Sequence, residues 1–154
     1  SHRKTVAGVI TIAAALRFQD PLAFLSPVLS KLVKSWPSPK AFHDKALDKQ
    51  RNRNYSKFPT PAFAELFAYS KDVENRLSFV SANSLIIQSR KDQIVKPVAA
   101  ELIYSRISAK QKQLKWFEKS GHEMLLDMES ADVATAITEQ IKVWTRAAVT
   151  EQED

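Results

Sequence analysis

Cysteine is absent from this chain of 154 residues. Its absence excludes a disulfide framework, a thiolate metal site and a cysteine nucleophile, and it agrees with the reducing cytoplasm, where we expect the protein to reside. Long apolar runs are lacking too. The longest, Val6–Leu16, is interrupted by Gly8 and Thr11, whereas a membrane-spanning helix needs about 20 apolar residues. We therefore expect no membrane span.

Histidine is scarce, with three in the chain. His2 is terminal and His43 stands beside Asp44 in a charged segment, so the histidines do not have the spacing of zinc ligands. Nothing else in the composition indicates a metal ion or an organic cofactor, and we expect neither.

Positive charge exceeds negative charge, with 23 Lys and Arg against 17 Asp and Glu. Nucleic-acid-binding domains usually gather such residues on one face. Here they are scattered along the chain, with one local cluster at Lys45–Lys57. We expect a solvated surface and no nucleic-acid partner. A basic helical nucleic-acid module is kept as an alternative, which a titration with oligonucleotides at low salt would test.

Apolar runs and helical spacings alternate along much of the chain. Val6–Ala13 is rich in β-branched residues, Ser84–Gln88 is a second short apolar run and Gln113–Phe117 alternates, so each is predicted to be a strand. Pro97–Arg106 and Ser130–Arg146 have the spacing of helices with one apolar stripe. This order predicts an α/β fold with a parallel sheet. The predicted core-facing residues are Val98, Leu102 and Ile103 in the first helix and Val133, Ile137, Ile141 and Trp144 in the second.

Prolines divide the part of the chain between the first two predicted strands. Asp20–Trp36 contains two prolines and predicts short helices in a surface subdomain. The charged segment Ala41–Tyr55 predicts a helix followed by a loop. A longer helix then begins at Pro61, with Thr60 as its predicted N-cap.

Asp92 and His122 each lie a few residues beyond a predicted strand, 30 residues apart in the sequence. Ligands of an open parallel sheet bind at the carboxyl ends of its strands. A carboxylate held against an imidazole Nδ1–H fixes the tautomer of the ring and stabilises the imidazolium. Gly121 would allow a tight turn just before the histidine. Either residue alone has an ordinary structural interpretation as a turn or cap residue, but the pair predicts acid–base chemistry.

The sequence around these two residues resembles a known family. Leu85–Asp92, then Lys115–His122 and Asp127-Met128-Glu129, is similar to the end of microbial carboxylesterases and monoacylglycerol lipases of the α/β-hydrolase superfamily. The resemblance is strongest over residues 81–144 and continues more loosely to the start.

The resemblance implies a partial fold and two catalytic roles. Residues 1–154 would be the C-terminal part of an α/β-hydrolase, with about three parallel strands, flanking helices and a helical cap at about 15–57. Asp92 would be the acid and His122 the general base of a catalytic triad, whereas Asp127 or Ser130 would cap the last helix.

One part of the family's pattern is missing. The nucleophilic serine of α/β-hydrolases lies in a G-x-S-x-G elbow, and the only glycines here are Gly8 and Gly121. The nucleophile and the oxyanion-hole loop would therefore precede Ser1. Ser120 stands at a turn and is not expected to be a nucleophile. We expect the chain alone to be inactive.

The leading hypothesis is a C-terminal part of a serine ester hydrolase that would act on acyl esters through a covalent acyl-enzyme. The alternative is a non-catalytic or complementing partner chain with the hydrolase fold. Val6–Ala13 would present an unpaired edge, to which a missing N-terminal half or a second copy would bind.

Six aromatic residues have two possible roles. Most of them are expected to be structural, and the other role is to line an acyl pocket beneath the cap. They are Phe18, Phe24, Trp36, Phe58, Phe63 and Phe67.

Overall fold

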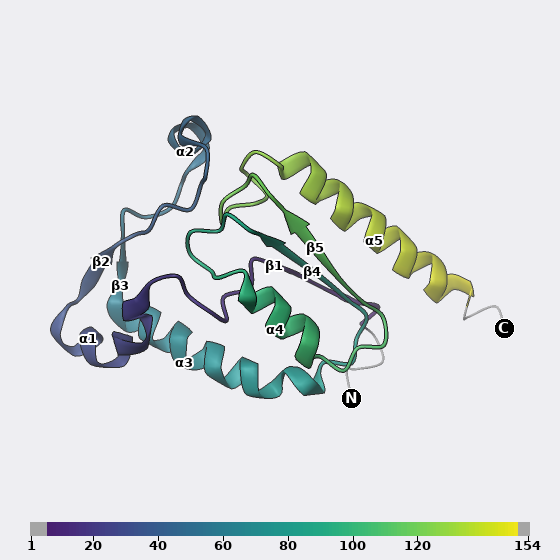
Figure 1. Ribbon diagram of the computed structural model, residues 1–154, viewed down its shortest axis with the longest axis horizontal. Helices are drawn as coiled ribbons and strands as arrows, with labels where there is room; N and C mark the ends of the chain where they lie inside the picture. Colours follow the sequence, from purple (N-terminus) through teal and green to yellow (C-terminus); the bar gives the residue numbers. More distant parts are fainter. Residues whose placement is uncertain (1–5, 151–154) are drawn as a thin grey trace.

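A parallel sheet of three strands lies at the centre of the molecule (Figure 1). The computed structural model describes residues 6–150. The strands are β1 (Val9–Ile12), β4 (Ser84–Ser89) and β5 (Lys112–Phe117), in the spatial order β1-β4-β5. The predicted α/β fold with about three parallel strands is confirmed.

The burial of each strand follows from its place in the sheet. All six residues of β4 are buried, because this strand has a neighbour on each side and helices above and below it. β1 occupies part of the predicted strand Val6–Ala13, but its residues are only partly buried. No other strand of the described residues pairs with its outer side. This agrees with the prediction of an unpaired edge.

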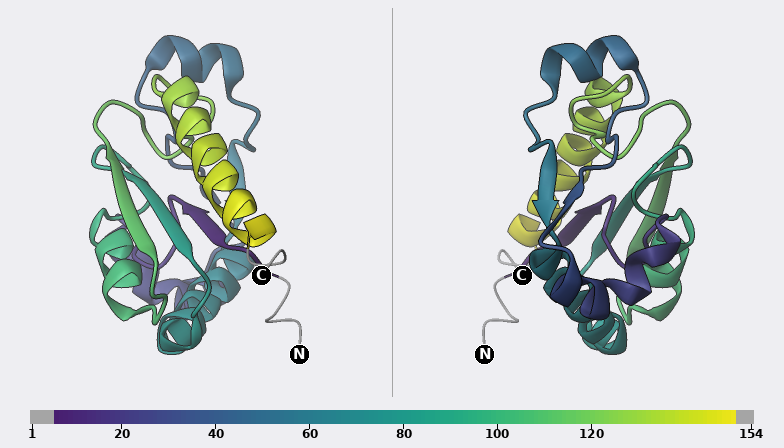
Figure 2. Two further views of the ribbon diagram at one scale, coloured as in Figure 1. Left: turned by 90° about the vertical axis from the view of Figure 1, so that its right-hand side faces the viewer. Right: turned by 90° about the vertical axis from the view of Figure 1, so that its left-hand side faces the viewer.

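Helices cover both faces of the sheet (Figures 1 and 2). α5 (Ser130–Thr150) lies on one face, and α3 (Thr60–Arg76) and α4 (Val98–Arg106) lie on the other. Side chains of β4 alternate between the two layers. Ile86 packs with residues of α4, whereas its two neighbours in sequence pack with residues of α5.

The last two helices bury narrower faces than predicted. α4 faces the sheet through two alanines and Ile103, and this orientation leaves Val98 exposed. In α5, Val133 and Trp144 are buried as predicted, but the side chain of Ile141 is 46% exposed. Helical spacing alone therefore predicted which segments are helices, but overestimated the width of their buried faces.

An arm of short elements projects from the sheet between β1 and α3 (Figure 1). Its ribbon of two antiparallel strands places Trp36 opposite Phe58. We call residues 21–59 the arm. The short helices predicted before Trp36, and the helix predicted after it, are both present. The elements are the 3₁₀ helix η2 (Pro21–Leu25), α1 (Ser26–Leu32), β2 (Ser35–Pro37), α2 (Lys45–Arg51) and β3 (Lys57–Pro59).

α3 begins without the predicted cap. Thr60 is its first helical residue, and Pro59 occupies the N-cap position. The Thr60 hydroxyl donates a hydrogen bond to the carbonyl oxygen of Val33. The backbone N–H of Thr60 donates to the carbonyl oxygen of Lys34 at 3.1 Å. Thr60 therefore ties α3 to the arm. At its other end α3 leads into the 3₁₀ helix η3 (Leu77–Phe79).

A buried carboxylate joins three segments on the α3 side of the sheet. Glu74 is 9% exposed and accepts hydrogen bonds from Arg17, which follows β1, and from Arg106 of α4 at 3.1 Å. Lys71 lies 3.7 Å away. The hydrogen bond from Arg17 lowers the pKa of Glu74 and outweighs burial, which opposes it.

Glu74→Gln is expected to lower the free energy of unfolding by about 2 kcal/mol, because it leaves the guanidinium groups of Arg17 and Arg106 without their carboxylate. Urea unfolding followed by circular dichroism measures the loss. Asp72→Asn is the matched control in the same helix. It removes an exposed pair with Arg76 and should cost less than about 0.5 kcal/mol. Equal losses in the two variants would contradict the prediction.

Candidate active site

The two predicted site residues meet at the carboxyl ends of neighbouring strands. Asp92 lies in the turn after β4, and His122 lies in the loop after β5. Nδ1 of His122 is 2.9 Å from Oδ2 of Asp92. The Asp92 side chain is fully buried, while the imidazole is 24% exposed. The pair therefore combines a buried acid with a base that solvent and ligands can reach.

Asp92 accepts four hydrogen bonds. The backbone N–H groups of Ile94 and Val95 donate to Oδ1, each at 2.8 Å. The side chains of Gln88 and His122 donate to Oδ2, each at 2.9 Å. Burial alone would raise the pKa of Asp92, but the hydrogen bond and charge of His122, with the two backbone N–H groups, hold that pKa below its ordinary value. Asp92 is therefore ionised at neutral pH.

The tautomer of His122 follows from this ionisation. An ionised carboxylate only accepts hydrogen bonds, so Nδ1 carries the proton in the contact with Asp92. Nε2 then holds the lone pair of the neutral ring, and none of the residues that the structure describes hydrogen-bonds to it. The ring can take a proton at Nε2 while Asp92 stabilises the cation that results.

A pocket of about 480 Å³ opens beside His122. Its walls come from the chain after β1, the β2–β3 ribbon and α3, and most of its surface is apolar. Its volume is within the range of small-molecule sites, roughly 300–1,000 Å³. Phe24, which is exposed, and Phe67, which packs against Phe18, do not line it. The aromatic residues that do are Phe18, Trp36, Phe58 and Phe63.

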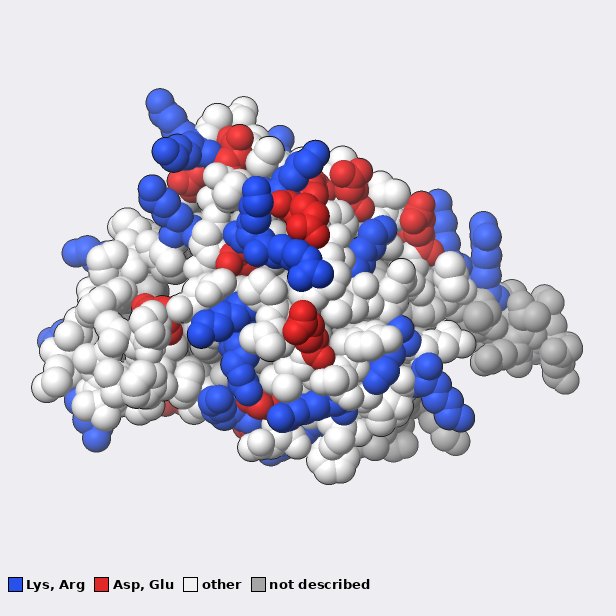
Figure 3. Space-filling view, in the orientation of Figure 1, with Lys and Arg blue, Asp and Glu red and all other residues white. Residues whose placement is uncertain are grey.

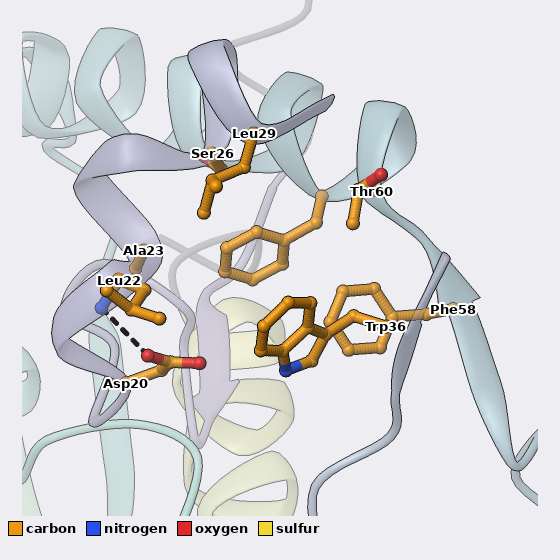
Figure 4. A pocket seen from close by; sticks show the side chains of 9 residues that line it. Asp20, Leu22, Ala23, Ser26, Leu29, Trp36, Phe58 and Thr60 are labelled. Carbon is orange, nitrogen blue, oxygen red and sulfur yellow. Dashed lines mark hydrogen bonds between the residues drawn. The ribbon is translucent and has the colours of Figure 1, made fainter. Parts of the chain in front are cut away.

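A smaller recess adjoins this pocket within the arm (Figure 4). Trp36 and Phe58 of the ribbon lie on one side of it, and residues of η2 and α1 lie on the other. Asp20 accepts a hydrogen bond from the backbone N–H of Leu22 at 2.8 Å. The buried hydroxyl of Ser26 has no hydrogen-bond partner among the described residues. The recess measures about 30 Å³, which is room for about one water.

A second buried carboxylate holds the arm against the loop of His122. Oδ2 of Asp127 accepts hydrogen bonds from the N–H groups of His43 at 2.7 Å and Gly121 at 2.6 Å. Oδ1 accepts one from Met128 at 2.9 Å. The sequence predicted that Asp127 or Ser130 caps the last helix, and the structure instead shows that Asp127 links the arm to the loop of His122. His43 and Asp127 are 84 positions apart, so no local pattern indicated their contact.

Gly121 is required by this link, and not by a special backbone angle. No described glycine has a positive φ. A Cβ atom on Gly121 would lie 2.6 Å from the carbonyl oxygen of Ala41 and 2.7 Å from the nitrogen of His43. The tight turn that the sequence predicted is therefore replaced by a close approach of two backbones.

The loop before His122 is held by a third carboxylate. Glu129 accepts hydrogen bonds from the backbone N–H groups of Lys119 at 2.9 Å and Ser120 at 2.8 Å. Burial would raise the pKa of Glu129, but these bonds hold it below its ordinary value. The Ser120 hydroxyl accepts a bond from the Glu129 N–H at 2.9 Å, and the Ser89 hydroxyl donates to the Ser120 carbonyl. Both hydroxyls are buried and engaged within the loop.

The other described histidine, His43, forms no hydrogen bond with this pair. His43 Nδ1 is 3.5 Å from the side-chain nitrogen of Gln93, and His2 lies outside the described residues. Within the described part of the chain, no cluster of three or more His, Asp or Glu residues has the arrangement of a metal site. None of the helices there combines the length and the apolarity that crossing a membrane requires.

A family model agrees with this geometry. The Hydrolase_4 model, serine aminopeptidase S33, matches residues 1–129. The chain belongs to this family. Among characterised relatives of this Hydrolase_4 chain, a carboxylesterase of Bacillus subtilis (strain 168) is 25% identical over 126 residues, which are 80% of this chain and 50% of the carboxylesterase.

Solved structures give the same fold. One of two metagenome-derived lipolytic enzymes matches with a TM-score of 0.82 at 28% identity, over 90% of this chain and 56% of the enzyme. The monoacylglycerol lipase of Paleococcus ferrophilus matches with a TM-score of 0.76 at 16% identity, over 90% of this chain and 60% of the lipase. The Hydrolase_4 chain thus spans about half the length of these relatives. It forms part of an α/β-hydrolase fold of the esterase and lipase group.

Asp127→Asn is expected to lower the free energy of unfolding by about 2–3 kcal/mol, because an amide –NH₂ would face backbone N–H donors that now meet a carboxylate. Hydrogen exchange should accelerate most at the amides of His43 and Gly121. Asp132→Asn, in the first turn of α5, is the control and should cost less than about 1 kcal/mol. Unchanged exchange at His43 would refute the proposed link.

The stability that Asp92 contributes is expected to depend on pH. Its pKa in the folded state is lower than the ordinary value of 3.8. The contribution is therefore complete at higher pH and is lost as the pH falls through the lowered pKa. The difference in unfolding free energy between the natural chain and Asp92→Asn should shrink as the pH falls below about 4. Urea unfolding at neutral and acidic pH measures it, and a constant difference would contradict the prediction.

Proposed function

We propose that the chain supplies the acid and the general base of a serine ester hydrolase, whose nucleophile lies in a preceding part of the same fold. The observation that carries the proposal is the contact of 2.9 Å between His122 Nδ1 and Asp92 Oδ2, beside an apolar pocket. The order of acid and base along the chain is that of α/β-hydrolases. The names of two relatives, a carboxylesterase and a lipolytic enzyme, support ester hydrolysis.

In the proposed reaction, Nε2 of His122 accepts the proton of the serine hydroxyl as its oxygen attacks the carbonyl carbon of the ester. The proton then passes from Nε2 to the departing alkoxide oxygen, and the acyl group remains on the serine. A water molecule gives a proton to Nε2 as its oxygen attacks the acyl-enzyme, and the serine leaves with that proton. Asp92 stays ionised throughout and stabilises each imidazolium.

The outer edge of β1 is the proposed place of the missing part. A further parallel strand would complete the backbone hydrogen bonds of this edge and bring its carboxyl end to the same side as Asp92 and His122. Self-association through the same edge is the proposed behaviour when no such strand is available. We propose in addition that residues 15–57 act as the cap over the pocket, since the β2–β3 ribbon forms part of its wall.

The proposed substrates are esters with an apolar acyl group. The surface of the pocket near His122 is mostly apolar and includes four aromatic rings. Such a lining favours hydrocarbon over a charged or strongly polar chain, which would lose its hydration without new hydrogen bonds. The family description names aminopeptidases, so a peptide amide is the competing substrate.

The alternative function is that of a non-catalytic partner chain with the hydrolase fold. The observation in its favour is that Ser89, at the end of β4, and Ser120, in the loop of His122, are both buried and have hydrogen-bonded hydroxyls. Neither of these two serines is then free to act as a nucleophile for His122. Complementation distinguishes the two functions, because a partner chain that only associates would restore no turnover.

The chain is expected to hydrolyse p-nitrophenyl butyrate only together with an N-terminal half. The test is co-expression with the part of the Bacillus subtilis carboxylesterase that precedes its matched region. Co-elution in size exclusion shows whether the complex forms. In the complex, His122→Ala should lower the hydrolysis rate by about 10³-fold or more, and an alanine p-nitroanilide, which reports aminopeptidase activity, should react far more slowly than the ester.

His43→Ala is the matched control, because it removes the other described histidine and leaves the pair with Asp92 intact. It should keep most of the activity of the complex. A complex that forms and hydrolyses nothing would overturn the proposal in favour of the non-catalytic partner. Hydrolysis by the chain alone that disappears with His122→Ala would show a nucleophile within these 154 residues and would also overturn it.

A further inference from the structure

The net positive charge of the chain is concentrated in the arm. Residues 21–59 hold eight Lys and Arg and only two Asp, a net charge of +6, which equals that of the whole chain. The remaining residues hold 15 of each sign. The basic residues therefore look scattered along the sequence, but their excess over acidic residues belongs to one structural element.

This charge is not neutralised within the molecule. All eight basic side chains of the arm are exposed, and none forms an ion pair with a carboxylate of the described residues. The two acids are engaged within α2. Asp44 accepts hydrogen bonds from the N–H groups that begin the helix, and Asp48 accepts one from Asn52 at 2.7 Å. The arm thus presents an uncompensated cationic surface.

The same element exposes an apolar stripe. Phe24, Val28 and Leu32 recur every four residues along η2 and α1, and these residues are 65%, 60% and 78% exposed. α1 packs against α3 and η2, so the stripe lies on its free side. In Figure 3 the surface over α1 is mostly uncharged, and Lys and Arg gather over α2 above it. An exposed apolar stripe beside a charged rim is typical of a contact surface.

We propose that the arm docks on membrane surfaces that contain anionic lipids. α1, the ribbon and α2 share the face shown in the right-hand view of Figure 2. Phe24, Val28 and Leu32 would enter the boundary between headgroups and acyl chains, and the basic side chains would contact the lipid phosphates. This surface is distinct from the acid–base pair, so the proposal does not depend on the hydrolytic function.

The charge and the stripe together select this partner over two others. A nucleic acid would attract the basic side chains but offers no apolar layer to receive the stripe. A second copy of the chain would bring an equal stripe together with an equal net charge of +6, which repels. An anionic bilayer satisfies both features. Trp36 and Phe58 of the ribbon also line the pocket beside His122, so docking would bring that pocket close to the lipid.

Flotation with vesicles tests the proposal on the full chain. Vesicles of phosphatidylcholine alone are compared with vesicles of phosphatidylcholine and phosphatidylglycerol in about equal parts. Binding to the anionic vesicles is expected to be at least about tenfold stronger and to weaken as salt is added. Equal binding to the two compositions, or binding to neither, would overturn the proposal.

Paired variants locate the surface. Lys34→Glu with Lys57→Glu should weaken binding to anionic vesicles at least about tenfold. Lys110→Glu with Lys142→Glu makes the same change in net charge outside the arm and should weaken it less than about twofold. Equal losses in the two pairs would mean a response to net charge alone and would overturn the proposal.

A second pair of double variants tests the apolar stripe. Phe24→Ser with Leu32→Ser should lower vesicle binding at least about fivefold, whereas Phe79→Ser with Val143→Ser, two exposed apolar residues outside the arm, should not. Circular dichroism and urea unfolding establish that each variant is folded.

Two other results would overturn the proposal. Tight binding to duplex DNA that depends on Lys34 and Lys57, without vesicle binding, would assign the surface to nucleic acid. A dimer that Phe24→Ser with Leu32→Ser abolishes, again without vesicle binding, would assign it to a second copy.

Discussion

A carboxylate removed from water needs hydrogen-bond donors around it, and two buried carboxylates and a partly buried one organise one end of this sheet. Asp92 fixes the turn after β4, Glu129 fixes the loop after β5, and Asp127 joins that loop to the arm. Backbone N–H groups donate hydrogen bonds to Asp127 and Glu129, and two of the four bonds to Asp92, so the path of the chain helps to hold all three. The contact between Asp92 and His122 is therefore set by the fold before any substrate arrives, which is the condition for effective acid–base catalysis.

The link through Asp127 has a mechanical consequence. One oxygen of this carboxylate receives N–H groups from the arm and from the residue that precedes His122. A movement of the arm that broke the bond from His43 would leave the buried carboxylate of Asp127 with one donor fewer. The loop that contains Gly121 and His122 would then shift, because the same carboxylate holds it. The arm and His122 thus share an anchor. The wall of the pocket and the orientation of His122 are coupled by one side chain, even though they come from distant parts of the sequence.

The spacing of apolar and polar residues along short segments predicted the strands and the residues that follow them. The apolar run of β4 and the alternation of β5 identified two strands, and the polar residues beyond them, Asp92 and His122, identified the pair. Contacts between distant segments were not predicted. The bond from His43 to Asp127 spans 84 positions, and the role of Gly121 depends on the backbone of the arm, which no periodicity encodes. The sequence showed the local cluster at Lys45–Lys57, but only the structure, by delimiting the arm as a unit, showed that the arm accounts for the whole excess of positive charge.

The order of the strands explains how an acid–base pair can be complete in a chain that holds no nucleophile elbow. The acid follows the central strand and the base follows the strand on one side of it, so their contact needs only β4 and β5. A strand added at the free edge of β1 would lie two strand spacings from β4, which is about 10 Å. Under the proposed function its carboxyl end would lie at the same end of the sheet as His122, whose Nε2 is left free by the contact with Asp92. The contact between Asp92 and His122 therefore needs only β4 and β5, whereas under the proposed function the nucleophile would come from a strand added at the edge of β1.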